Sequence, residues 1–336
     1  MPAVCCGGSD LFDSGAALLG EFVLMLKDWI SEARPRTLML GLTNCALGCA
    51  LGFYYGEVNC YTVATACMIV LTGTLLQILC NFANDYGDAY KQADGVNRLG
   101  PIRAVMSGAI SIAQLRKGMA VVTMLSAISG IVAVVMAVGG NLQVLSWFVF
   151  LGVIAILASL LYTIGMAYGY KGLGDVVVFI FFGLVAVLGS QILVTAAGDS
   201  GLDIYPDTML LGISVGAGSV MVLHVAGMRD IQEDRQNGKR TMAARLGYKL
   251  SSIYLGVLFV TVALSSFAAC IMSHKFWECA LILLALLPLL ASTVRTIKYA
   301  SDGAKIAPEL KYTSMGVGIH NVFWMIVLTV DYWVYC

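Results

Sequence analysis

Nine long apolar stretches constrain the fold of this chain more than any other feature of its sequence. Each is about 20 residues long, the length that an α-helix needs to cross roughly 30 Å of hydrocarbon. They cover residues 37–56, 61–84, 115–138, 142–164, 173–197, 208–228, 251–272, 277–296 and 313–335. Only 12% of the 336 residues are charged, about half the usual share in soluble domains. The sequence therefore predicts an all-α, polytopic membrane protein with nine transmembrane helices.

The placement of basic residues supports this number of helices independently. With nine spans, the N-terminus and the loops after the second, fourth, sixth and eighth spans lie on one side. These segments, together with the ends of the spans that adjoin them, hold every Lys and Arg of the chain except Lys275. By the positive-inside rule this side faces the cytoplasm, so we expect a multi-pass protein of the cell (inner or plasma) membrane. A nucleic-acid partner is not expected, because no basic patch is interleaved with exposed aromatic residues.

The N-terminal region differs from the remainder of the chain. Residues 16–30 mix apolar side chains with Glu21, Lys27 and Asp28, a pattern typical of an amphipathic helix on the membrane surface. We therefore expect two parts: residues 1–36, a tail with an amphipathic interfacial helix, and residues 37–336, the nine-helix transmembrane domain. No feature of the sequence implies a protein partner.

Charged residues near the ends of the spans carry most of the functional information, because charge is costly at membrane depth. The first acidic segment follows the second span. If the helix continues into it, Asn81, Asp85 and Asp88 lie within about 60° of one another on one face. Asn81 adds weight to a functional interpretation, since a buried amide needs a partner in lipid.

A second acidic segment follows the sixth span, where Asp230 and Asp234 form an i, i+4 pair. Carboxylates this close repel each other, so a cation between them is favoured. A few carboxylates together with substrate phosphates are the usual ligands of Mg²⁺. The nearby basic residues suited to the phosphate oxygens are Lys91, Arg98, Arg103, Lys239 and Arg240. The alternative is a solvated, salt-bridged surface, but both segments end an apolar span on the same side.

Three further polar residues lie within the apolar spans. Tyr162, near the end of the fourth span, is a candidate for stabilising a developing cation through its ring, or else a tyrosine of the membrane interface. His224 and His320 are interpreted as packed core histidines.

These segments resemble the UbiA superfamily of intramembrane prenyltransferases. The resemblance is carried by residues 81–88 with Asp94, by the run Arg-Leu-Gly-Pro-Ile-Arg ending at Arg103, and by residues 229–241. It extends from Glu32 to the last span. Within the superfamily, the Asn-Asp-Tyr-Gly-Asp core and the Gly-Leu-Gly-Asp run ending at Asp175 are similar to the branch that prenylates 1,4-dihydroxy-2-naphthoate in menaquinone synthesis.

The resemblance implies a nine-helix bundle around a central cavity that opens sideways to lipid. It implies one Mg²⁺ on Asn81, Asp85 and Asp88 and a second on Asp230 and Asp234, with the basic residues contacting the diphosphate. It makes Arg36 a candidate for the carboxylate of an aromatic acid acceptor. The implied reaction transfers a polyprenyl group from polyprenyl diphosphate to the acceptor, with decarboxylation to demethylmenaquinone.

Two other functions remain open from the sequence. The same fold could prenylate another acceptor, such as 4-hydroxybenzoate, homogentisate or haem, or attach a chlorophyll tail. A transporter is the alternative of a different class, and it predicts ionisable residues near the middle of the membrane. The carboxylates of this chain instead gather at one predicted cytoplasmic surface, apart from those in outer loops and tails.

Overall fold

The computed structural model describes residues 24–91, 103–272 and 276–335 of the chain, and this part is built from helices without strands. Nine of its helical segments are long and apolar enough to span a membrane, which confirms the predicted number. They are α2 (Pro35–Tyr55), α3 (Cys60–Tyr90), α4 (Ile112–Val138), α5 (Leu142–Leu161), the consecutive α6 (Gly174–Val178), η2 (Phe179–Gly189) and α7 (Ser190–Ala197), α8 (Pro206–Arg229), α10 (Met242–Met272), α11 (Phe276–Lys298) and α13 (Glu309–Tyr335).

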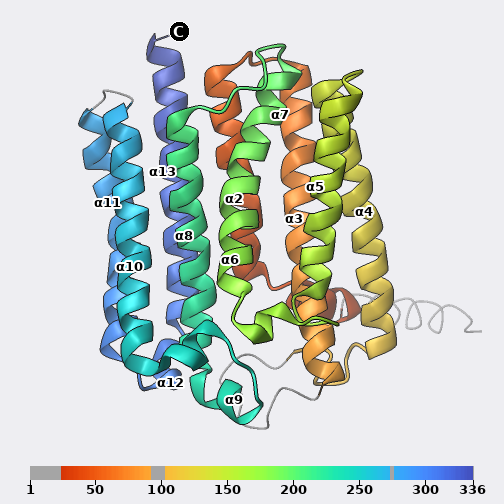
Figure 1. Cartoon of the computed structure of the whole chain (residues 1–336), viewed down its shortest axis with the longest axis vertical. Helices are drawn as coiled ribbons and strands as arrows, with labels where there is room; N and C mark the ends of the chain where they lie inside the picture. Colours follow the sequence, from red (N-terminus) through yellow and green to blue (C-terminus); the bar gives the residue numbers. More distant parts are fainter. Residues whose placement is uncertain (1–23, 92–102, 273–275, 336) are drawn as a thin grey trace, which may run out of the picture.

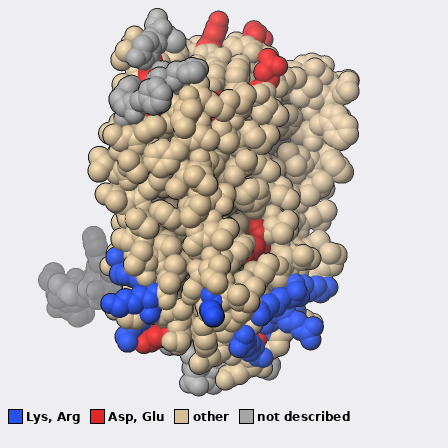
Figure 2. Space-filling view, turned by 60° about the vertical axis from the view of Figure 1, so that its left-hand side comes forward, with Lys and Arg blue, Asp and Glu red and all other residues tan. Residues whose placement is uncertain are grey.

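The helices form one bundle in which α2 lies near the centre. In Figure 1, α3, α4 and α5 stand on one side of α2, and α8, α10, α11 and α13 stand on the other. The short helices α9 (Ile231–Gln236) and α12 (Gly303–Ile306) lie at the lower end of this view. Lys and Arg side chains gather at the lower end of the face shown in Figure 2, as the charge segregation of the sequence requires.

The N-terminal segment is described only from residue 24. Residues 24–32 are helical, and the ring of Trp29 lies 5.5 Å from the ring of Phe82 on α3. Most of the predicted tail and the first part of the predicted amphipathic helix lie outside the described residues. The described turns expose Leu24, Met25 and Ile30, as a helix lying in a membrane interface would.

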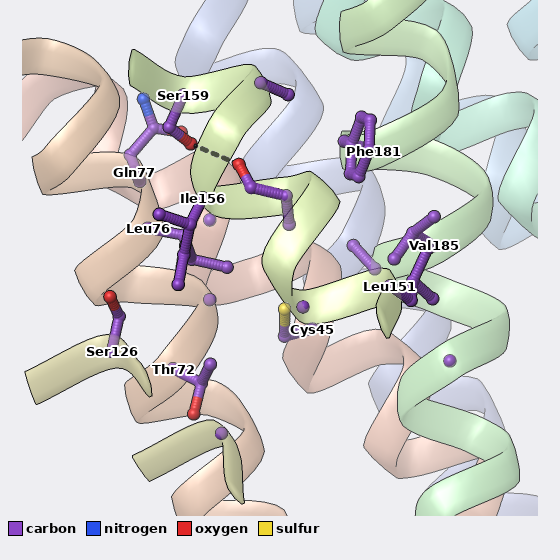
Figure 3. Close-up of a pocket in the computed structure, with 18 of the residues that line it drawn as sticks. Cys45, Thr72, Leu76, Gln77, Ser126, Leu151, Ile156, Ser159, Phe181 and Val185 are labelled. Atoms are coloured by element: carbon purple, nitrogen blue, oxygen red, sulfur yellow. Dashed lines mark hydrogen bonds between the residues drawn. The ribbon is translucent and has the colours of Figure 1, made fainter. Parts of the chain in front are cut away.

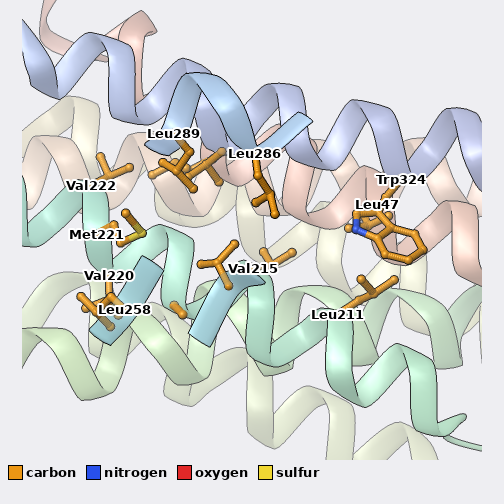
Figure 4. Packing of buried hydrophobic residues seen from close by; sticks show 14 of the residues in the cluster. Leu47, Leu211, Val215, Val220, Met221, Val222, Leu258, Leu286, Leu289 and Trp324 are labelled. Carbon is orange, nitrogen blue, oxygen red and sulfur yellow. The ribbon is translucent and has the colours of Figure 1, made fainter. Parts of the chain in front are cut away.

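The apolar core is centred on α8. Leu211, Val215 and Met221 of this helix belong to one buried apolar cluster that also contains Leu47 of α2 and Trp324 of α13 (Figure 4). Most of α8 is buried inside the bundle, whereas Ala155 is the only buried residue of α5. Apolar residues on the outside of α5 are expected where lipid is the solvent.

A buried polar network also links the central helices. The side-chain amide of Asn44 on α2 donates to the Phe182 carbonyl at 2.8 Å and accepts from Asn321 on α13 at 2.8 Å. His320 is buried, and its Nε2 lies 2.8 Å from the hydroxyl of Ser266 on α10. Since lipid offers no hydrogen bonds, these polar groups must satisfy one another inside the bundle. His320 is therefore the packed core histidine that the sequence predicts.

The fifth span is not a regular α-helix, because η2 widens into π-helical turns between α6 and α7. At Gly183 of η2 the backbone approaches α8 closely. A Cβ at this position would lie 2.4 Å from the Cα of Gly216. Small residues allow such close helix packing in membranes.

We predict that Gly183→Ala destabilises the bundle by about 1–3 kcal/mol, because the added methyl group must push η2 away from α8. Gly256→Ala on α10 is the matched control, since a Cβ there meets nothing within 4 Å. Thermal unfolding of both variants in the same detergent measures the difference. Equal midpoints for the two variants would contradict the predicted close contact.

Candidate active site

A cavity of about 990 Å³ lies at the basic end of the bundle. It is lined by parts of both acidic segments and by residues that precede α2. The predicted site residues in its wall are Arg36, Asn81, Asp88, Arg103, Tyr162, Asp230, Asp234 and Lys239. Asp85, Lys91 and Arg240 do not line it, and Arg98 lies outside the described residues. One cavity therefore brings together side chains that are up to about two hundred positions apart in the sequence.

The first acidic segment is a helical continuation of α3, as the sequence analysis assumed. Asp85 is buried there and forms ion pairs with Arg34 and Arg103. Its Oδ2 is buried and has no hydrogen-bond partner among the described residues. Arg34 has a left-handed backbone, with φ of 56°. The side chain of Asn81 stabilises this turn, because its amide donates to the Ala33 carbonyl at 2.8 Å.

Asp88 connects the two acidic segments. Its carboxylate accepts a hydrogen bond from the Tyr170 hydroxyl and lies 3.0 Å from the ammonium of Lys239, which follows α9. Lys91 lies on the other side, with its ammonium 4.4 Å from the centre of the Tyr170 ring and donating to the Thr163 carbonyl at 2.8 Å. Burial, and then the neighbouring Lys239, lower the pKa of Lys91. Asp88 is thus held within a cluster of two lysines and a tyrosine.

The second acidic segment departs from a continuous helix. Helix α8 ends at Arg229, and Asp230 interrupts it before α9 begins. The Arg229 guanidinium donates to both oxygens of Asp230, at 2.6 and 2.5 Å. Asp234 on α9 accepts from the Thr241 hydroxyl at 2.7 Å. Burial raises the pKa of Asp234 to about 6, so its charged form lacks part of the stabilisation that water gives an ordinary aspartate.

The donor set of this end of the cavity suits a hard cation. It consists of carboxylate oxygens and an amide, the ligands that Mg²⁺ takes together with phosphate and water. Among the described residues, however, no three His, Cys, Asp or Glu side chains converge closely enough to hold a metal by themselves. Asp85, Asp88 and Asp230 are instead paired with Arg or Lys of this chain. The unpartnered Oδ2 of Asp85 and the poorly stabilised charge of Asp234 are the atoms that a cation would satisfy.

Several residues of the cavity were not predicted as part of the site. These are Arg34, Tyr170, Asp175, His224 and Arg229. Tyr170 and Asp175 lie in the Gly-Tyr-Lys-Gly-Leu-Gly-Asp run after the fourth span, whose density of glycines was the available signal. His224 was interpreted as a packed core residue; it is buried, but it also borders the cavity. Its position in an apolar helix gave no sign of the cavity beside it.

A second, apolar cavity of about 260 Å³ continues from the first between α3, α4, α5 and η2. Leu76, Ile156, Phe181 and Val185 lie around it (Figure 3). The residues that line both cavities are Gln77, Cys80, Tyr162, Val178 and Phe182. A ligand with a charged head and an apolar chain fits this continuous arrangement.

The chain is similar to known membrane prenyltransferases. The sequence model of the UbiA prenyltransferase family matches residues 37–315. The 1,4-dihydroxy-2-naphthoate octaprenyltransferase of Haemophilus influenzae is 36% identical over 306 residues, covering 91% of this chain and 96% of that protein. The Escherichia coli protein of the same name is 32% identical over 308 residues, with the same two coverages.

Solved structures of low sequence identity share the fold. A UbiA homolog from Aeropyrum pernix K1 superposes with a TM-score of 0.62 at 14% identity, covering 88% of this chain and 97% of that one. A UbiA homolog from Archaeoglobus fulgidus, solved with DMAPP and Mg²⁺, gives 0.52 at 13% identity, with coverages of 90% and 99%. At this identity the likeness supports the fold alone.

We predict that Asp85→Asn destabilises the protein by about 3 kcal/mol, because it removes the buried negative charge that pairs with both Arg34 and Arg103. The exposed pair of Asp302 and Lys305 provides the control, and Lys305→Gln should leave the unfolding midpoint unchanged. Thermal unfolding in detergent checks both. An Asp85→Asn protein as stable as the control would argue against a structural role for this ion-pair cluster.

Proposed function

The chain belongs to the UbiA prenyltransferase family, and on that premise we propose that it transfers a polyprenyl group from polyprenyl diphosphate to 1,4-dihydroxy-2-naphthoate in menaquinone synthesis. It is a multi-pass membrane enzyme of the prenyltransferase class. The observation that carries the proposal is the single cavity in which both acidic segments meet basic side chains and from which an apolar cavity extends. The acceptor is proposed from the two bacterial relatives named for it, which match nearly their whole length.

The diphosphate is proposed to bind where the two acidic segments meet. Asn81, Asp85 and Asp88 on α3 would hold one Mg²⁺ beside it, and Asp230 and Asp234 would hold a second. Bound Mg²⁺ would supply stabilisation of the negative charge that develops on the diphosphate as the allylic C–O bond breaks. Lys239 and Arg103, both in the cavity wall, supply further positive charge to the same oxygens.

The prenyl chain is proposed to occupy the apolar cavity. Tyr162 lies at the junction of the two cavities, where the reacting end of the prenyl group would lie, and its ring would face the allylic carbon as positive charge develops. The apolar walls exclude water, which would otherwise capture that carbon.

The aromatic acceptor is proposed to enter beside Arg36, which is exposed and lines the cavity. A guanidinium binds a carboxylate through two parallel hydrogen bonds, so Arg36 would orient the acid. The ring carbon that bears the carboxylate then attacks the allylic carbon. The carboxylate leaves as carbon dioxide, and the product is the quinol, the reduced form of demethylmenaquinone.

The membrane orientation and the division of the chain are also proposals. We place the basic end of the bundle, and with it the acidic segments, on the cytoplasmic face of the cell membrane. We propose that residues 1–36 form a peripheral segment and that residues 37–336 form the catalytic transmembrane domain.

We predict that Asp234→Asn lowers turnover about 100-fold or more, since it removes a charge that would hold the cation against the leaving diphosphate. The assay uses the full chain in nanodiscs with octaprenyl diphosphate, Mg²⁺ and 1,4-dihydroxy-2-naphthoate, and 4-hydroxybenzoate as the competing acceptor. Gln232→Ala, an exposed neighbour on α9, is the control and should retain full activity. Product formed only from 4-hydroxybenzoate would show that the proposed acceptor is wrong. No product from any acceptor would refute the proposed activity.

We predict that Gly152→Leu shortens the longest prenyl diphosphate that the enzyme uses. Gly152 of α5 lines the apolar cavity, and a Cβ added there meets nothing within 4 Å, so we expect a leucine side chain to occupy part of the cavity without displacing the backbone. Gly256→Leu on α10 adds the same side chain away from the cavity. Relative rates with geranyl, farnesyl and octaprenyl diphosphates measure the effect. An unchanged chain-length preference in Gly152→Leu would place the prenyl chain elsewhere.

A further inference from the structure

Two buried polar side chains face each other in the wall of the large cavity and have no role in the proposed handling of the diphosphate. Asp175 begins the fifth span on α6, and His224 lies on α8. Their relative exposures are 7% and 1%. The Oδ2 of Asp175 and the Nδ1 of His224 are 4.0 Å apart, too far for a hydrogen bond. Neither atom has a hydrogen-bond partner in the described part of the chain.

The hydrogen bond of the His224 Nε2 determines whether Nδ1, the ring nitrogen that faces Asp175, is a donor or an acceptor. Nε2 of His224 lies 3.2 Å from the Ser251 carbonyl on α10. Because a carbonyl only accepts, Nε2 carries the proton of the neutral ring, and Nδ1 presents a lone pair. A carboxylate oxygen and an imidazole lone pair therefore face each other, and both need a donor.

Buried hydrogen-bond acceptors nearly always have a donor in native proteins. Two neighbouring acceptors without one are therefore expected where a ligand supplies the donor. Both residues border the cavity in which the acceptor would bind. The side chain of Asp175 retains some exposure there, whereas that of His224 has none. A ligand hydroxyl would thus contact Asp175, with His224 directly behind it.

We propose that Asp175 binds a hydroxyl of the aromatic acceptor and takes its proton as the carbon–carbon bond forms, and that His224 positions this carboxylate. The assignment rests on the proposed function, because it needs a hydroxylated aromatic acceptor. Asp175 is then a catalytic base that touches the substrate, and His224 is a positioning residue.

The bonds and charges of this step balance. The hydroxyl next to the carboxylate-bearing carbon loses its proton to Asp175, and its oxygen becomes a ketone. The ring electrons form the new bond to the allylic carbon, while the C–O bond to the diphosphate breaks and leaves its electron pair on the diphosphate. The product is a β-keto acid. Loss of CO₂ returns the electron pair to the ketone oxygen, which takes the proton back from Asp175 to give the quinol.

The surroundings of Asp175 contain few groups that could replace it. The titratable side chains beside it are His224 of α8, Tyr254 of α10 and Tyr162 after α5. Tyr254 interacts with the Asp175 carboxylate through its hydroxyl and packs edge-on against the His224 ring at 4.8 Å. A phenol is a far weaker base than a carboxylate at neutral pH, so Asp175 and His224 are the groups able to accept the proton.

The experiment begins with the wild-type chain in nanodiscs, with octaprenyl diphosphate, Mg²⁺ and 1,4-dihydroxy-2-naphthoate. Asp175→Asn keeps the shape of the side chain but cannot accept a proton. General-base catalysis contributes about 10²- to 10⁴-fold, so kcat should fall at least 100-fold. Mg²⁺-dependent binding of a non-reactive prenyl thiodiphosphate should be unchanged. Asp331→Asn is the control. Asp331 is a buried carboxylate near the C-terminal end of α13, away from the cavity, so this substitution should leave kcat unchanged.

The pH profile separates a base from a structural residue. In the wild type, kcat/KM should rise with pH as the base loses its proton, and this rise should be absent in Asp175→Asn. Asp175→Glu restores a carboxylate and should recover part of the rate. His224→Gln should lower kcat less than Asp175→Asn does and displace the midpoint of the pH profile.

The outcomes distinguish the two proposals. If the wild type forms no prenylated product, the proposed function fails. If the wild type is active and Asp175→Asn retains its kcat and pH profile, the assignment of the base is wrong. Should Asp175→Asn not fold, His224→Gln still tests the assignment, and a wild-type kcat and pH profile in that variant would overturn it.

Discussion

The absence of water inside a bilayer governs how this molecule is built. Polar groups at membrane depth must find partners within the protein. The chain meets this requirement by two separate means. Mid-bundle polar groups such as Asn44, Asn321 and His320 are neutral and bond to one another, whereas the charged residues of the cavity lie at one end of the helices. Reactive charge is thereby kept out of the segment where it would be most costly.

The charged end is balanced by ion pairs within the chain. Asp85 lies between Arg34 and Arg103, Asp88 pairs with Lys239, and Asp230 pairs with Arg229. Carboxylates clustered without cations would repel one another, and so would guanidinium groups clustered without anions. Mixing the two signs lets both gather around one cavity. A cation and an anion that bind together in this cavity would therefore replace ion pairs that the chain already makes.

The fold could be predicted from the sequence to a large extent, because span length and basic-loop placement are read directly from apolar runs and from Lys and Arg. The first acidic segment was also predictable, since α3 simply continues to Asp88. The break at Asp230 was not, because i, i+4 spacing fits a continuous helix equally well. Asp175 and His224 were not predicted as site residues. Their significance depends on a 4.0 Å approach between two helices, which no local pattern encodes.

The two cavities have few lining residues in common. Gln77, Cys80, Tyr162, Val178 and Phe182 border both, and the remaining residues of the apolar cavity come chiefly from α3, α4, α5 and η2. The charged cavity draws instead on α8, α9 and the segments before α2 and after α12. Sequence drift in the outer helices can therefore alter the space for an apolar chain while the reacting end stays intact. Under the proposed function, this separation makes prenyl-chain length a trait that can evolve independently of the reacting end.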